Sequence, residues 1–277
     1  MKEIDRHIDI MGIVNLTDDS YFAGSRCAGC DEALERMAVL IAEGASIIDL
    51  GACSTRPGSE PVGPMAEWER LCPVIEAAVE RFQGMRLSID TYHAEVVEKA
   101  YRLISDKVGE DVAGRILVVN DISAGEDDPG MLPLVGRLGL SYVAMHKRGK
   151  PSVMQDMCQY DDVVEEVLRY FEDFAVKAEA YGIEDWIIDP GFGFSKTVEQ
   201  NYALLNGLDK FAETGRKVLV GVSRKSMIYR KLGITPEESL PATQVLHLKA
   251  LQNGADILRV HDVAEAVRTV ALYRVLR

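Results

Sequence analysis

Short runs of Ile, Val and Leu recur along the whole chain and alternate with segments of helical periodicity. The eight runs that we interpret as strands cover residues 10–14, 46–50, 86–89, 116–119, 141–145, 186–188, 218–222 and 256–260. Between them, apolar residues such as Ala33, Met37, Leu40 and Ile41 follow the spacing of an amphipathic helix. Strand and helix are therefore predicted to alternate throughout.

The predicted strands are apolar almost without interruption, which favours a parallel sheet whose outer face is covered by helices. Eight repeats of strand and helix predict an α/β fold of the (β/α)8 TIM-barrel class, as a single domain over residues 1–277. The main competitor is an open doubly wound sheet, which usually has a glycine-rich fingerprint after its first strand. Residues 15–20 read NLTDDS and lack the GxGxxG spacing, so the barrel is preferred.

Composition narrows the functional classes. The 277 residues carry 31 Lys and Arg against 44 Asp and Glu, a formal net charge of −13, and no basic run that could follow a nucleic-acid backbone. No stretch of 18 uncharged apolar residues occurs, and charges precede the first apolar run, so neither a membrane span nor a signal peptide is expected. Five scattered cysteines, an odd number, fit a reducing compartment. We expect a cytoplasmic globular protein with neither nucleic acid nor membrane as partner.

Polar and charged side chains follow every predicted strand. In a TIM barrel the carboxyl ends of the strands share one face, where the loops build the active site. The candidates at these ends are Asn15, Thr55, Arg56, Asp90, Asn120, His146, Asp189, Ser223, Lys225, Arg259 and His261. Helix capping suits Asp121 and Ser123 about as well as a functional role does. Capping does not explain Lys225, Arg259 and His261, because cations oppose the dipole at a helix N-terminus unless an anion binds there.

The candidates divide into two chemistries. A flat heterocycle that donates hydrogen bonds from one edge would suit the first group, which consists of Asp90, Asn120, Asp189 and Lys225. A phosphate or pyrophosphate with Mg²⁺ would suit the second group, which consists of Asn15, Arg56, Arg259 and His261. The sequence thus predicts that a ring and an anionic leaving group meet in one site.

Eight motifs at these strand ends resemble the dihydropteroate synthase family over essentially the whole chain. They are MGIVNLT (11–17), GACSTRPG (51–58), SIDT (88–91), NDIS (120–123), MH (145–146), DPGFGFSKT (189–197), GVSRKS (221–226) and RVHDV (259–263). Each motif alone is a weak match, whereas eight in the expected order are specific. The resemblance implies a transferase of folate biosynthesis that joins 6-hydroxymethyl-7,8-dihydropterin pyrophosphate to 4-aminobenzoate, giving 7,8-dihydropteroate and pyrophosphate.

The same resemblance implies a role for each matching residue. The expected pterin-binding residues are Asp90, Asn120, Asp189, Lys225 and Arg259. The expected pyrophosphate-binding residues are Asn15, Arg56, Arg259 and His261, and Asn15 is also expected to contact Mg²⁺, the implied cofactor. The expected aminobenzoate-binding residues are Thr55, Arg56, Phe194, Ser223 and Lys225. The expected catalytic residues are Asp90, Lys225, Arg259 and His261. A homodimer in contact through the last helices is implied as well.

The implied chemistry explains why no Cys or Ser nucleophile with a partner base is apparent. None is needed if the C–O bond to pyrophosphate ionises first and the electron-rich pterin spreads the positive charge. Mg²⁺ and the Arg and His donors would stabilise the departing charge. The carboxylate of Asp90 would favour the cation, although the sequence does not establish it as a base.

A few positions depart from the family pattern. Asp18 stands where the family usually has proline, and Ser195 stands where Gly precedes Lys-Thr. Ala52 and Cys53 occupy positions where the family has Gly and often Glu or Gln. Two alternatives stay open: a pterin-dependent methyltransferase relative, which has no use for a pyrophosphate grip, and a pterin-binding barrel that no longer turns over, for which Asp18 is the only support.

Overall fold

The computed structural model describes residues 6–16, 27, 29–53, 62–149 and 153–276. Within these residues the strands are β1 (Asp9–Asn15), β2 (Ile47–Gly51), β3 (Arg86–Asp90), β4 (Leu117–Asp121), β5 (Ser141–Met145), β6 (Trp186–Asp189), β7 (Leu219–Val220) and β8 (Ile257–Val260). Every strand pairing is parallel. The predicted order of eight strands is confirmed.

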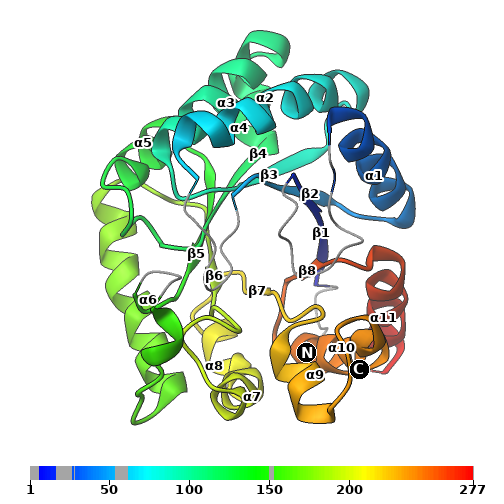
Figure 1. Ribbon diagram of the computed structural model, residues 1–277. Coiled ribbons are helices and arrows are strands. Elements are labelled where there is room, and N and C mark those ends of the chain that lie inside the picture. Colours follow the sequence, from blue (N-terminus) through cyan, green and yellow to red (C-terminus); the bar gives the residue numbers. More distant parts are fainter. Residues whose placement is uncertain (1–5, 17–26, 28, 54–61, 150–152, 277) are drawn as a thin grey trace.

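Helices surround the strands on the outside of the molecule (Figure 1). They are α1 (Cys30–Glu43), α2 (Pro64–Arg81), α3 (Ala94–Val108), α4 (Glu110–Ile116), α5 (Met131–Leu138), α6 (Val163–Ala180), α7 (Val198–Asn206), α8 (Leu208–Ala212), α9 (Ser226–Leu232), α10 (Leu240–Gln252) and α11 (Val263–Leu276). Two short 3₁₀ helices, η2 (Met154–Asp156) and η3 (Glu237–Ser239), lie in the loops before α6 and α10. The chain is thus a (β/α)8 barrel, as predicted.

Local side-chain chemistry sets several helix ends. Asp162 accepts hydrogen bonds from the backbone N–H groups of Val164 and Glu165, at 2.9 and 3.2 Å, where α6 begins. Thr197 and Gln200 form a reciprocal capping box at the start of α7. These caps satisfy backbone donors that have no partner inside the helix.

The sheet closes on itself between β6 and β7 at one point. Its strand order is β6-β5-β4-β3-β2-β1-β8-β7. Ile188 and Val218 form an isolated parallel bridge between the first and last strands of that order, and the N–H of Ile188 donates to the carbonyl of Lys217 at 2.9 Å. Seven neighbouring strand pairs of the barrel therefore form regular ladders, and the eighth pair, β6 and β7, is joined by this one bridge, which we call the seam.

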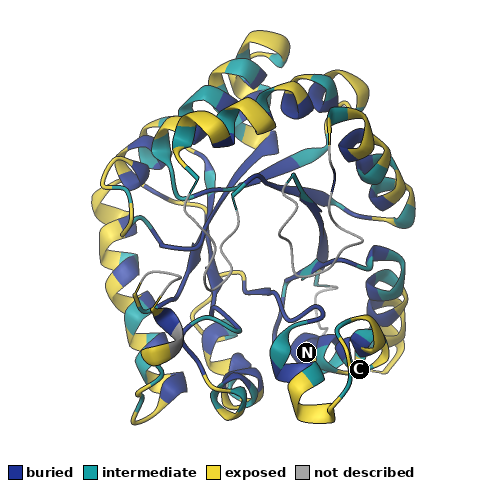
Figure 2. Cartoon of the chain, viewed as in Figure 1, coloured by how far each residue is buried: buried dark blue, intermediate teal, exposed yellow. Residues whose placement is uncertain are grey.

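Apolar side chains fill both the interior of the barrel and the layer beneath the helices. The interior cluster consists of Met11, Ile47, Val118, Val143, Ile187, Leu219 and Ile257. The strands are buried along their length, whereas the helices are exposed mainly on their outward sides (Figure 2). Residues buried on both faces of a strand explain the near-continuous apolar runs of the sequence.

Two elements differ from the sequence prediction. The run 218–222 gives only Leu219–Val220 as a strand, because the chain turns at Val222, whose carbonyl accepts from the N–H of Lys225 at 3.1 Å. The run 116–119 begins one residue early, because Ile116 completes α4. No described helix is long and apolar enough to cross a membrane. That residues 1–277 form one domain stays a prediction.

A buried histidine in α10 is expected to make the fold sensitive to acid. His247 is fully buried; its Nδ1 lies 3.2 Å from Oε1 of Gln244, and its Nε2 has no described partner. Burial lowers the pKa of His247 to about 4. An unfolded histidine has a pKa of about 6.5, so below that pH the unfolded chain takes up a proton that the folded chain refuses, and the free energy of unfolding falls.

Between pH 7 and pH 5, we expect the free energy of unfolding to fall by about 2 kcal/mol less in His247→Leu than in the parent protein. Urea unfolding at both pH values measures the difference. His7→Leu is the control, because the side chain of His7 is 80% exposed. Parallel losses in the parent and in His247→Leu would contradict the prediction.

Candidate functional site

Asn15 and Asp90 lie on either side of Gly51 at the carboxyl ends of β1, β2 and β3. A Cβ atom on Gly51 would lie 3.3 Å from Oδ1 of Asn15 and 3.6 Å from Cβ of Asp90. Glycine therefore leaves room between these two predicted site residues. Strand pairing sets the arrangement, since Asn15 is in register with Gly51 and Gly51 with Asp90.

Arg259 of β8 bridges two buried carboxylates inside the mouth of the barrel. Its Nε donates to Oδ2 of Asp49 and its Nη2 to Oδ2 of Asp90, both at 2.7 Å. The side chain of Asp49 is fully buried, whereas that of Arg259 is 20% exposed. Burial raises the pKa of Asp90 to about 7, although the charge of Arg259 acts to lower it. The positive charge of Arg259 is thus already compensated in the structure.

Asp49 is a site residue that the sequence prediction missed. Its Oδ1 accepts from Oγ of Ser88 at 2.5 Å and from Nδ2 of Asn120 at 3.3 Å. It therefore connects the predicted pterin residue Asn120 to Arg259. A signal was present in the sequence: Asp49 stands two residues after Ile47, and alternate residues of a strand share a face, so a carboxylate was to be expected inside the barrel.

Asp189 and Lys225 form a second buried group. Lys225 Nζ donates to the carbonyl of Phe192 and lies 4.9 Å from the centre of the Phe194 ring. Asp189 Oδ1 accepts from the N–H of Gly191 at 2.8 Å. Burial lowers the pKa of Lys225 to about 8, an effect that Asp189 opposes. Burial also raises the pKa of Asp189, and here Lys225 is the main opposing charge. A buried carboxylate and a partly buried amine therefore face one site.

Lys225 and Arg259 approach one another beside Gly221. A Cβ atom on Gly221 would lie 3.9 Å from Nζ of Lys225 and 3.9 Å from Cβ of Arg259. The two buried groups, one centred on Lys225 and the other on Arg259, therefore adjoin at this glycine. The predicted pterin-binding side chains are brought together in this way.

Ser223 and His261 form a buried pair at the ends of β7 and β8. Ser223 Oγ lies 3.0 Å from Nδ1 of His261 and accepts from the backbone N–H of His261 at 3.3 Å. Burial lowers the pKa of His261 to about 3, and the charge of Arg259 lowers it further. The neutral form of His261 is therefore favoured in this structure, and its role toward an anion stays a prediction. A neutral imidazole still offers a hydrogen bond to a ligand.

Arg224 joins the ends of β7 and β8. Its Nε and Nη2 donate to the two carboxylate oxygens of Asp262 at 2.8 and 2.9 Å, and its Nη1 donates to the carbonyls of Pro236 and Glu237. The sequence prediction gave Arg224 no role. Because Arg224 follows Ser223 and Asp262 follows His261, this bidentate pair keeps the Ser223 and His261 side chains adjacent.

Asp121 has a structural role at the end of β4. Its carboxylate accepts from the backbone N–H of Ser123 at 2.7 Å, from that of Gly125 at 2.9 Å and from the hydroxyl of Tyr142 at 2.7 Å. These bonds turn the chain after β4. Turn formation accounts for these contacts of Asp121, and the next described helix, α5, begins only at Met131.

Two predicted site residues, Thr55 and Arg56, lie outside the described residues, as does Asp18. No group of three or more His, Cys, Asp or Glu side chains that could hold a metal ion occurs among the described residues.

Comparisons with known proteins agree with this geometry. The family model described as pterin binding enzyme matches residues 11–261. The dihydropteroate synthase of Escherichia coli (strain K12) is 39% identical over 266 residues, which are 95% of this chain and 90% of that protein. The chain belongs to the dihydropteroate synthase family.

Solved structures of other dihydropteroate synthases have the same fold. The Yersinia pestis enzyme in a sulfonamide drug complex superposes with a TM-score of 0.89 at 35% identity, covering 98% of this chain and 94% of that one. The Xanthomonas albilineans enzyme with 4-aminobenzoic acid gives a TM-score of 0.84 at 37% identity, covering 98% and 93% of the two chains. Coverage of nearly the full length places all eight strands within the resemblance.

One departure from the dihydropteroate synthase pattern is described by the structure in full. Ser195 stands where the family usually has glycine and adopts a left-handed φ of 51°. Its Oγ accepts from the backbone N–H of Arg148 at 2.9 Å and donates to the carbonyl of Arg148 at 2.7 Å. A non-glycine residue is strained in this region. Two hydrogen bonds to the neighbouring loop offset that strain.

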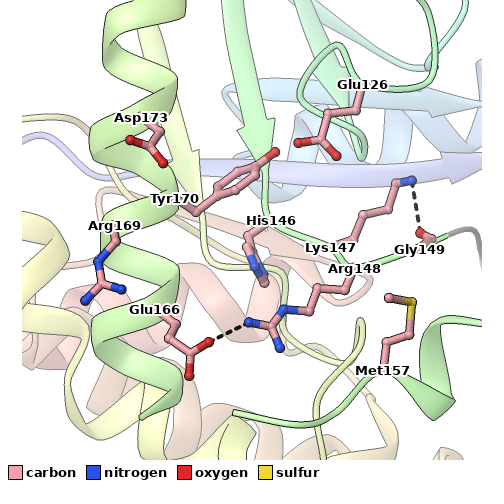
Figure 3. A pocket seen from close by; sticks show the side chains of 10 residues that line it. All are labelled: Glu126, His146, Lys147, Arg148, Gly149, Met157, Glu166, Arg169, Tyr170 and Asp173. Atoms are coloured by element: carbon pink, nitrogen blue, oxygen red, sulfur yellow. Dashed lines mark hydrogen bonds and ion pairs between the residues drawn. The ribbon is translucent and has the colours of Figure 1, made fainter. Parts of the chain in front are cut away.

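A polar pocket of about 390 Å³ lies beside the barrel mouth of this dihydropteroate synthase, between the loop after β5 and α6 (Figure 3). Its lining residues are Glu126, His146, Lys147, Arg148, Gly149, Met157, Glu166, Arg169, Tyr170 and Asp173. Arg148 pairs with Glu166 at 2.6 Å, and Lys147 pairs with Asp127 at 2.8 Å. Of the candidates at the strand ends that the structure describes, His146 alone lines this pocket.

Proposed function

We propose that this dihydropteroate synthase joins 6-hydroxymethyl-7,8-dihydropterin pyrophosphate to 4-aminobenzoate by a route in which the C–O bond to pyrophosphate ionises before the amine attacks. The observation that carries the proposal is the meeting of two buried charged groups at one mouth: Arg259 with its two carboxylates, and Lys225 with Asp189. The related Xanthomonas albilineans enzyme was solved with 4-aminobenzoic acid, which supports this second substrate.

The pterin ring suits the acceptors of the mouth. One oxygen of Asp189 already accepts from the N–H of Gly191, so its other oxygen and remaining lone pair are assigned to the amino-pyrimidine edge of the ring. Asn120 is held by Asp49 and presents an amide to the same space. A buried carboxylate needs such donors, because a polar group that loses water without replacement is costly.

Pyrophosphate is assigned to Arg259, His261 and Asn15. In the structure Arg259 is paired with carboxylates and His261 is neutral, so the arriving anion would raise the pKa of His261 and draw the guanidinium outward. Proton uptake and rearrangement would then accompany binding. These residues would stabilise the leaving group only once it is present.

Mg²⁺ fits this mouth as an ion that enters with pyrophosphate. Mg²⁺ usually takes one or two protein oxygens and completes its shell with substrate phosphates and water. Asn15 offers Oδ1 beside the space that Gly51 leaves, and no described cluster would hold the ion by itself. When bound, Mg²⁺ would supply Lewis-acid stabilisation of the departing charge.

The protein group assigned to the reacting carbon is a carboxylate that stabilises positive charge, and it forms no bond to that carbon. Asp90 adjoins the mouth with a raised pKa, and a developing cation nearby would favour its ionised form. Lys225, above the Phe194 ring, is placed to orient the carboxylate of aminobenzoate or the ring that it joins. Attack by the amine on the pterin cation forms the C–N bond, and the amine nitrogen gives up one proton to solvent. Pyrophosphate, whose C–O bond broke in the first step, then leaves the site.

The proposed function is tested by pyrophosphate release from purified protein with Mg²⁺, the pterin pyrophosphate and 4-aminobenzoate, each omitted in turn. We expect product of the mass of dihydropteroate only when all three are present. Pterin binding without product would contradict the proposal and favour a barrel that no longer turns over. Product without added Mg²⁺, after chelation, would contradict the assigned role of the ion.

We also propose a homodimer in contact through the last helices. Apolar side chains that are largely exposed there support it: Val245 of α10, and Leu272, Val275 and Leu276 of α11. Sedimentation at micromolar concentration would show twice the chain mass, and Val275→Glu is expected to shift it toward the single chain. The cytoplasmic location stays a prediction.

A further inference from the structure

We propose that Lys196 is a positioning residue for the transfer reaction: its buried ammonium group holds the loop between β6 and α7 in the shape that presents Asp189 and Phe194 to the substrates. The inference rests on the proposed function, because it assigns Lys196 to the placement of the predicted pterin and aminobenzoate groups. Lys196 itself is directed away from the substrates, into the backbone of the loop.

Lys196 is surrounded by backbone carbonyls and an imidazole. Its Nζ donates to the carbonyls of Phe194 at 2.9 Å and Gly191 at 3.1 Å, and to Nδ1 of His146 at 3.0 Å. The residue is only 3% exposed, and it makes no ion pair with any residue that the structure describes. The carbonyl of His146, at 3.4 Å, is a fourth acceptor near Nζ. The three protons of an ammonium suit the three shorter contacts. Burial lowers the pKa of Lys196 to about 7, and the charge of Asp189 acts to raise it. The carbonyl dipoles stabilise the protonated form, and its hydrogen bonds hold the loop.

The imidazole partner is neutral. Burial lowers the pKa of His146 to about 2, and the charge of Lys196 lowers it further. Nδ1 is therefore available as an acceptor at any working pH, which places the ring proton on Nε2. His146 follows β5 directly, so the contact ties the β6 loop to the next strand of the barrel.

The loop needs such a tie because its backbone is unusual. Gly191, Gly193 and Ser195 have left-handed φ angles of 73°, 82° and 51°. A Cβ atom on Gly191 would lie 2.0 Å from the carbonyl oxygen of His146, so the two backbones are in close contact. Alternate left-handed residues make a tight coil that the chain would not keep alone. Lys196 bonds to the carbonyls at both ends of this coil.

The coil carries one predicted group for each substrate. At its start, Asp189 accepts from the N–H of Gly191, whose carbonyl Lys196 holds. At its end, the Phe194 ring packs beneath Nζ of Lys225, and the Phe194 carbonyl accepts from Lys196. A shift of the coil would therefore move Asp189 and Phe194 together.

The test compares Lys196→Met with Lys147→Met. Lys147 is a matched control, because it is 6% exposed, follows His146 directly, and bonds to Asp127 and the carbonyl of Gly149 rather than to the β6 loop. We expect Lys196→Met to lower kcat/KM for 4-aminobenzoate about 10- to 100-fold, mainly through a higher KM. Lys147→Met should keep the parent KM.

The split between KM and kcat separates positioning from mere loss of folded protein. Partial unfolding reduces the active fraction and so lowers the apparent kcat, whereas a displaced binding group raises KM. A folded Lys196→Met protein with the parent KM would overturn the proposal. Crystal structures of the two proteins add a direct measurement, since an unchanged backbone over residues 190–195 in Lys196→Met would also overturn it.

Two further measurements keep the proposal falsifiable. If Lys196→Met does not fold, Ser195→Gly removes the other tie of the loop while suiting its left-handed backbone, and should raise KM about 3-fold. An unchanged KM there would count against the proposal. If the parent protein forms no product, the proposed function fails, and calorimetric binding of 4-aminobenzoate and the pterin pyrophosphate to parent and Lys196→Met decides the inference separately: equal affinities would overturn it.

Discussion

Replacing Lys225 by methionine is expected to lower kcat/KM about 10²- to 10³-fold while leaving the protein as stable as the parent. The amine adjoins Asp189, Arg259 and the Phe194 ring, and it is the charge that most strongly opposes the effect of burial on Asp189. Burial lowers the pKa of Lys225 from 10.5 to about 8. The unfolded chain therefore keeps the proton more readily. Removal of the amine relieves this desolvation cost, which offsets the loss of its charge beside Asp189.

Steady-state kinetics of Lys225→Met measure the fall in kcat/KM, and thermal unfolding of the same preparation measures the unchanged stability. If the ammonium form is required, kcat/KM of the parent should decline as the pH rises through about 8, where the pKa of Lys225 lies. Lys249→Met, a change on α10, serves as the control. A Lys225→Met protein that retains parental kcat/KM would remove Lys225 from the machinery, and one that unfolds early would make its role structural.

Replacing Asp49 by asparagine is expected to destabilise the protein by about 3 kcal/mol and to lower kcat/KM about 10²-fold. The fully buried carboxylate accepts from Arg259, Ser88 and Asn120 at once. Loss of one charge of a buried pair leaves the other without full compensation. Asp90 remains as a partner of Arg259, which keeps the expected cost at the lower end of the usual range.

Asp9→Asn separates the two effects of Asp49→Asn. Asp9 is also a buried carboxylate on a strand of the barrel, bonded to Ser46 at 2.8 Å and to Arg86 at 3.4 Å. It begins β1, at the end of the barrel opposite the mouth, where bonds contribute to stability rather than catalysis. Urea unfolding should show a loss in both variants, whereas turnover should fall in Asp49→Asn alone. Equal kcat/KM in the two variants would contradict the role given to Asp49.

The barrel could be predicted because its signal is repeated eight times. Each apolar run indicated a strand, and each run ended in a polar residue, so the sequence predicted Asp90, Asn120, Asp189 and Arg259 at one mouth. Strand ends were less certain: the run 218–222 looked continuous, but the turn at Val222 depends on a backbone bond to Lys225 that composition does not show.

Charge states and second-layer contacts could not be read from the sequence in the same way. His261 resembles a cation at a helix start, but its burial beside Arg259 keeps it neutral. Asp49 sits within an apolar run and looks like an interruption, although its position faces the barrel interior. Arg224 and Lys196 donate hydrogen bonds to backbone carbonyls. Because every residue has a carbonyl, the pattern of side chains along the sequence does not predict these partners.

If the pterin binds Asp189 and Lys225 as proposed, its binding is coupled to closure of the barrel at the single bridge between Ile188 and Val218. Asp189 ends the strand on one side of that seam, and Lys225 follows the strand on the other. A pterin bound to both residues would connect β6 and β7, the strand pair with the fewest backbone contacts. Its binding free energy would then oppose separation of these two strands. Substrate binding would thus stabilise the closed barrel, which backbone pairing closes between β6 and β7 at one point.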